Sequence, residues 1–145
     1  MSAAVPRRYW GSRLDLKASA GYSGATALVQ TTTSPGGGWD LNGNPGWYAR
    51  VDPAQTYTAS IWVRATRAVK VRIGLDLLRS NGTPSGTSTG RWVTISPGAW
   101  TKLVVSGIKP TGTEVYAGMA PMFAAAAKGT VIYWGDMDLT LSDAK

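Results

Sequence analysis

The sequence has 145 residues and lacks both cysteine and histidine, and it has one phenylalanine and one glutamate, Glu114. These absences exclude thiol nucleophiles, imidazole general bases, Ser-His-Asp triads and the usual zinc sites. Apolar runs extend over only a handful of residues, so we expect no membrane-spanning segment. The first twelve residues lack the apolar core of a secretory signal peptide. A chain of this length folds as one domain without a disulfide or metal.

Charge and composition narrow the class of protein further. Fifteen Lys and Arg residues against eight acidic ones give a net charge of +7, which favours an anionic partner or surface. The basic residues are spread along the chain instead of gathering on one strand face, so we expect no nucleic-acid partner. Eighteen glycines, eight prolines and seven tryptophans are poor helix material and suit strands and tight turns.

Apolar residues alternate with period two in short segments separated by Gly, Pro, Ser and Thr clusters. The predicted strands are 13–17, 25–31, 47–51, 56–64, 69–78, 91–95, 101–105, 115–122 and 130–141. Two polar segments, 31–46 and 79–90, are expected to be long loops, the second with an Asn-Gly turn. Eight or nine strands without a helical pattern predict an all-β antiparallel sandwich of the jelly-roll type over 13–145. A flexible basic arm is expected over 1–12.

Two central strands have clearly different faces. Tyr57, Ala59, Ile61 and Val63 share one face of segment 56–64, and Trp62 lies on the other. Segment 69–78 has an unbroken apolar face at its odd-numbered residues, while its other face carries Arg72 and Asp76. A sandwich buries the apolar faces between its sheets, which leaves Trp62, Arg72 and Asp76 outside. An aromatic ring with charged hydrogen-bonding groups suits a sugar site.

Three further aromatic residues are candidate ligand contacts. Alternation in 130–141 places Trp134 and Asp136 outward, opposite Tyr133 and Met137, and alternation in 115–122 places Tyr116 outward. Trp39 lies in the expected glycine-rich loop. The alternative for each is a structural role in the core or at a sheet end. We predict no metal or cofactor, although Asp136 and Asp138 leave a structural calcium ion as an alternative to strand-end hydrogen bonding.

Four segments, SGATALVQT, ARVDPAQTYTASIWVRA, RWVTISPGAWTKLVVSG and GTVIYWGDMDLTL, resemble the carbohydrate-binding modules of the family four, nine and twenty-two group. The matching positions run from Gly24 to Leu28, Thr56 to Val63, Gly98 to Leu103 and Tyr133 to Leu139. The resemblance implies a β-jelly roll, found beside glycoside hydrolases, with its ligand cleft on the concave sheet face. The chain lacks the family's Asn-Gly-x-Phe-Glu opening, on which its structural calcium often draws. The pattern also resembles jelly-roll modules of phage tail and virion proteins.

The sequence therefore predicts a non-catalytic module that binds a polysaccharide or cell-wall glycan, outside the cell or on a virion. Trp62, Trp134, Trp39 and Tyr116 are the predicted stacking residues, and Arg72 and Asp76 the predicted polar contacts. The alternative is a phage head-decoration or tail protein that contacts other virion subunits or forms a homo-oligomer. A glycosidase is disfavoured because Glu114 is expected in a turn. The one outward carboxylate pairing, Asp76 with Asp136 or Asp138, has no feature that would keep either group in the protonated form that a general acid requires.

Overall fold

The structure is a computed structural model that describes residues 8–40, 49–81, 83–110 and 112–141. These residues form fourteen β-strands and no helix, so no helix in them could cross a membrane. The strands are β1 (Arg8–Trp10), β2 (Ser12–Lys17), β3 (Ala27–Thr32), β4 (Gly37–Asp40), β5 (Ala49–Arg50), β6 (Tyr57–Ala65), β7 (Val69–Arg72), β8 (Gly74–Arg79), β9 (Pro84–Thr89), β10 (Val93–Ile95), β11 (Thr101–Ile108), β12 (Glu114–Met119), β13 (Met122–Ala124) and β14 (Val131–Leu141).

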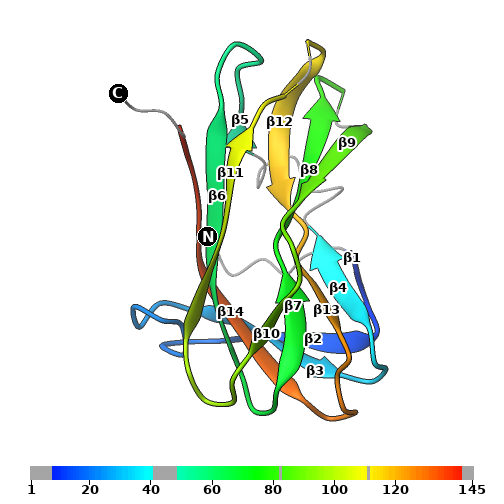
Figure 1. Ribbon diagram of the computed structural model, residues 1–145, viewed down its shortest axis with the longest axis vertical. Coiled ribbons are helices and arrows are strands. Elements are labelled where there is room, and N and C mark those ends of the chain that lie inside the picture. The colour runs from blue at the N-terminus through cyan, green and yellow to red at the C-terminus, as the bar shows by residue number, and fades with distance from the viewer. Residues whose placement is uncertain (1–7, 41–48, 82, 111, 142–145) are drawn as a thin grey trace.

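The strands pair antiparallel and build the predicted β-sandwich (Figure 1). Layer 1 is the five-stranded sheet β11-β6-β14-β3-β2. Layer 2 consists of two sheets placed end to end, β5-β12-β8-β9 and β1-β4-β13-β7-β10. Both predicted apolar faces are buried, with Ile61 and Val63 of layer 1 facing Val71 and Leu75 of layer 2 within one core.

Layer 2 divides into two sheets because two of its strands are interrupted at the same level. The predicted strand 69–78 is interrupted at Ile73, which separates β7 from β8. The predicted strand 115–122 is interrupted at Ala120 and Pro121, which separate β12 from β13. The Ala120 N–H donates to the Gly74 carbonyl at 2.8 Å, and Pro121 has no N–H to continue a ladder. A Cβ atom on Gly74 would lie 2.3 Å from the Ala120 oxygen, so this close approach requires glycine. These breaks raise the strand count above the eight or nine predicted.

Three segments predicted as loops or arm contain strands. Gly37–Asp40 forms β4 in the middle of a sheet, Pro84–Thr89 pairs with β8 as β9, and Arg8–Trp10 forms the edge strand β1. The glycines in 36–38 suggested a loop, but here they allow close packing within a sheet. A Cβ on Gly38 would lie 3.0 Å from the Trp10 ring. The prediction of loops there, and of a flexible arm extending to residue 12, was wrong. The first two residues of expected strand 47–51 lie outside the described residues.

Strand β14 contains a β-bulge that reverses the predicted faces of the residues before it, while Met137 and Leu139 beyond it pack against the core as predicted. Its pairing moves three residues, from Gly135 to Asp138, while β6 moves only two, from Trp62 to Ser60. Asp136 lies in the extra step and has φ 52°. Ahead of the bulge Trp134 points into the core and is 1% exposed, so its predicted outward position was wrong. The predicted faces follow from unbroken alternation, and one inserted residue exchanges the two faces of the residues before it.

Candidate functional site

A row of side chains crosses the outer face of layer 2, and we call it the Trp10–Trp92 row. The register pairs Arg72 with Met122, Met122 with Gly38, and Gly38 with Trp10, so these positions share one face. Trp92 comes one residue before the Val93–Val71 pair and therefore lies opposite Arg72. The row consequently runs Trp92, Arg72, Met122, Gly38, Trp10 across five neighbouring strands.

The two tryptophans at the ends of the row are accessible. Trp10 is 42% exposed and Trp92 is 39% exposed. Between them the Trp10 ring and the Met122 side chain cover Gly38, where a Cβ would lie 3.0 Å from the Trp10 ring and 3.1 Å from Met122 Cγ. With strands about 4.8 Å apart, the row spans roughly 19 Å between β1 and β10. This is a long, shallow surface with an aromatic residue at each end.

Arg72 is the charged group within the row. Its guanidinium carbon lies 4.5 Å from the centre of the Trp92 ring, a cation–π contact that holds both side chains. Nη2 donates to the Met122 sulfur at 3.6 Å, a weak acceptor, and Nε is buried without a hydrogen-bond partner. Among the described residues Arg72 forms no ion pair. The buried Nε is out of reach of a ligand, and the Nη donors that do not face Met122 are those available to one bound beside Trp92.

Two other predicted site residues lie on the same outer face, further along layer 2. Asp76 accepts a hydrogen bond from Thr87 Oγ1 at 3.2 Å and lies opposite Gly118, which leaves space above it. Tyr116 is half-buried, with the Arg50 guanidinium 5.6 Å from its ring centre. Asp76 is four residues, about 13 Å, from Arg72 along the layer, so both cannot bind one sugar ring.

Trp62 does not join this face, contrary to the sequence prediction. It belongs to β6 in layer 1 and points away from the sandwich on the opposite side. The Tyr22 ring covers it in a parallel stack, with ring centres 3.7 Å apart and planes 2° from parallel. The prediction that Trp62, Arg72 and Asp76 share a cleft was wrong because β6 and β7, although adjacent in sequence, belong to different layers.

Trp39 and Trp134 are core residues. Trp39 is fully buried on β4, and its ring meets Trp134 edge-on, with centres 6.3 Å apart across the two layers. The Trp134 Nε1–H donates to Gln30 Oε1 at 2.9 Å. Neither indole offers a face to a ligand outside the sandwich, so the structural alternative holds for both.

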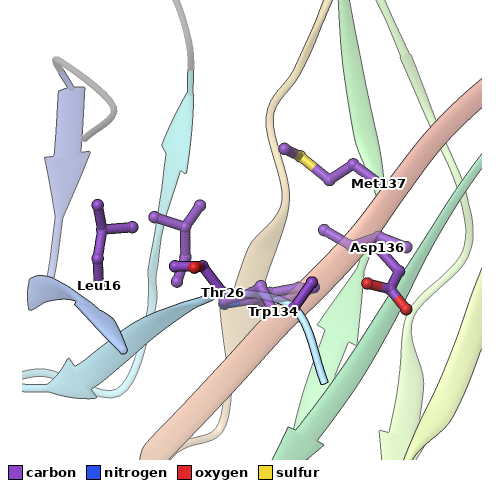
Figure 2. Close-up of a pocket in the computed structure, with 9 residues that line it drawn as sticks. Leu16, Thr26, Trp134, Asp136 and Met137 are labelled. Carbon is purple, nitrogen blue, oxygen red and sulfur yellow. The ribbon is translucent and has the colours of Figure 1, made fainter. Parts of the chain in front are cut away.

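A cavity of about 410 Å³ lies beside Trp134 (Figure 2). Leu16, Thr26 and Met137 also line it. Asp136 is at its rim, and its carboxylate accepts hydrogen bonds from Ser23 N at 3.1 Å and Ser23 Oγ at 3.0 Å. No group of three or more acidic side chains in the described ranges could hold a metal ion.

Sequence reasoning missed Trp92 and Trp10. For Trp92 a signal was present, because Val93 and Ile95 set the inward face of β10 and leave Trp92 on the outward one. Trp10 was assigned to a flexible arm, and no local pattern indicates that it pairs with a glycine-rich strand.

Residues 8–114 match the carbohydrate binding domain family CBM_4_9. That match covers well over half of the chain, so the chain belongs to this family of carbohydrate-binding modules. The predicted resemblance and the predicted binding function are thereby confirmed. None of the curated protein sequences matches the chain.

Solved structures share the fold at low sequence identity. The CBM22-1 and GH10 modules of xylanase 10B from Clostridium thermocellum, complexed with xylohexaose, match with a TM-score of 0.68 and 16% identity, over 94% of this chain and 26% of that one. The CBM22-1 xylan-binding domain of Paenibacillus barcinonensis Xyn10C gives 0.63 and 15%, over 97% and 86%. The enzymatically active domain of bacteriophage CBA120 tailspike protein 4 gives 0.61 and 10%, over 92% and 18%. The chain thus spans about a quarter of the xylanase chain.

Proposed function

We propose that this module binds a polysaccharide chain along the Trp10–Trp92 row, with the two indole rings stacking on sugar rings and Arg72 donating hydrogen bonds to hydroxyl oxygens. The observation that carries the proposal is Arg72 itself. Its guanidinium packs against Trp92 and has no acidic partner among the described residues. Its Nη groups therefore retain N–H donors for a ligand that lies between the two exposed tryptophans. Asp76 and Tyr116 extend the same face and are proposed contacts for a longer ligand.

The glycan proposed first is a xylan. Two structural neighbours are described by their binding to xylan or xylohexaose, and a row roughly 19 Å long accommodates several linked sugar rings. The positive charge of the chain also favours glycans that carry acidic substituents, as cell-wall polymers do.

The proposal includes a non-catalytic role outside the cell. The family is defined by carbohydrate binding, and the row contains one charged side chain, a cation that cannot act as a general acid at neutral pH. The virion role is supported only by the similarity of the fold to a tailspike domain. That similarity does not distinguish a virion protein from any other module with this fold.

The test is calorimetric titration of xylohexaose, and of a panel of cell-wall polysaccharides, into the full chain. Trp92→Ala and Arg72→Gln are each expected to weaken binding about tenfold, because each removes a ligand contact of about 1–2 kcal/mol. Val104→Ala, an exposed change on layer 1, serves as the control and should leave the affinity unchanged. Equal binding by all three variants would show that the glycan lies elsewhere.

A further inference from the structure

The outer face of layer 1 carries four aromatic residues and an arginine, which we call the Tyr22–Arg64 cluster: Tyr22, Trp62, Trp100, Arg64 and Tyr133. Tyr22 lies flat on Trp62, as described above, and Trp100 meets Tyr22 edge-on, with ring centres 6.0 Å apart and planes at 80°. Tyr22 remains 49% exposed although one of its ring faces is covered. Its other face is therefore a flat platform, with Trp100 standing nearly perpendicular to it.

Arg64 lies next to this platform, where two aromatic rings hold its guanidinium and no carboxylate of the described residues pairs with its charge. Its guanidinium carbon is 4.6 Å from the Tyr133 ring centre and 5.3 Å from the Trp100 ring centre. No described residue accepts a hydrogen bond from it or forms an ion pair with it. Its five donors are therefore available in a fixed orientation, the arrangement that binds a carboxylate with two parallel hydrogen bonds.

A hollow adjoins Arg64 on the same face. Its volume is about 370 Å³, near the lower end of the range of roughly 300–1,000 Å³ that is usual for small-molecule sites. Arg64 and Tyr133 form one side of it, and the other lining residues are Ala65, Thr66, Pro97 and Gly98. The platform, the unpaired cation and the hollow are thus contiguous through Arg64.

The charges around the cluster favour an anion. Lys102 is exposed and lies opposite Trp62 on the neighbouring strand. Asp136 directs both carboxylate oxygens to Ser23, and this tie fixes the loop that carries Tyr22. Asp138 lies opposite Ser60, four residues or about 13 Å along β6 from Arg64. Asp15 lies in the same row as Arg64 but three strands away, about 14 Å.

We propose that the Tyr22–Arg64 cluster is a second glycan site, on the face opposite the Trp10–Trp92 row, and that it binds a sugar ring bearing a carboxylate. The ring stacks on the exposed face of Tyr22 beside Trp100, and its carboxylate accepts two hydrogen bonds from Arg64. The two sites lie on opposite layers, so one module binds two separate glycan chains. A module of this kind links neighbouring chains in a polysaccharide network.

The test is an NMR titration of the full chain with a trisaccharide of galacturonic acid, using galactotriose as the matched neutral probe. The acidic probe is expected to shift the Trp100 indole N–H signal and to leave that of Trp92 in place. Arg64→Gln should raise the dissociation constant about tenfold or more, and Arg64→Lys should weaken it less, because the charge stays while the two-pronged geometry is lost. Arg13→Gln removes the same charge from an exposed position on β2 and should have no effect.

Several outcomes would overturn the proposal: no shift at Trp100, equal shifts from galactotriose, equal shifts from acetate at the same carboxylate concentration, or stronger binding of oligothymidylate at these residues. The last would make the cluster a nucleic-acid site. Xylohexaose titrated into the same sample reports the first site through Trp92. Failure there removes the proposed xylan binding without affecting the result at Trp100.

Discussion

The buried hydrogen bond between Gln30 and Trp134 allows a stability prediction of known size. Gln30 is fully buried, accepts the Trp134 Nε1–H at 2.9 Å and donates from Nε2 to Ser12 Oγ at 2.9 Å. Gln30→Leu keeps a similar volume but leaves the indole N–H buried without an acceptor. An orphaned polar group of this kind costs about 1–3 kcal/mol. Ser12 is partly exposed, so water replaces its lost donor at little cost.

Thermal unfolding of the variant should show the loss directly. For a chain of this length, about 1–3 kcal/mol corresponds to a melting temperature lowered by about 3–12 °C. The Trp134→Phe variant supplies the control, because phenylalanine has no N–H to satisfy. In that background Gln30→Leu should cost much less, which gives a coupling free energy of about 1–2 kcal/mol in the double-mutant cycle. Additive effects would refute the reasoning that an unsatisfied indole N–H causes the loss.

Three other changes test single features of the structure. Gly74→Ala places a methyl group against the Ala120 carbonyl and should lower the free energy of unfolding by about 1–3 kcal/mol, measured by urea denaturation. Trp39→Ala should cost about 3–5 kcal/mol in the same assay, and a loss below about 1 kcal/mol would contradict its place in the core. Asp136→Ala should free Tyr22 and shift the tryptophan fluorescence to longer wavelength. Asp136→Gly should give the same shift with a smaller stability loss, because glycine tolerates φ 52°.

Alternation alone predicted the fold class and most of the core. Every residue predicted on the inward faces of β6 and of β7 with β8 is buried, because these strands alternate between two apolar layers, although Leu78 and Ser60, predicted on the outward faces, are buried as well. The same rule failed on the part of β14 before Asp136, where the bulge exchanges the faces. The local signals of that bulge are the consecutive apolar residues 131–134, which do not alternate, and Gly135, an isolated glycine inside a strand.

The site was predicted less well than the core, for a topological reason. The alternation of side chains along each strand predicts that Trp62 and Arg72 both point outward. It does not predict which layer each strand joins, and β6 and β7 belong to opposite layers. The Tyr22 stack on Trp62 arises from a loop contact 40 residues apart in sequence, between residues 22 and 62, which no spacing indicates. Trp92, by contrast, was within reach of the parity argument.

The central claim is that a glycan lies along the Trp10–Trp92 row. Intermolecular nuclear Overhauser effects between xylohexaose and the assigned indole protons test it most directly. The account predicts effects from sugar ring protons to both Trp10 and Trp92 in the complex. Saturable binding with effects only to Tyr22 or Trp100 would place the neutral glycan on the opposite layer and contradict the account.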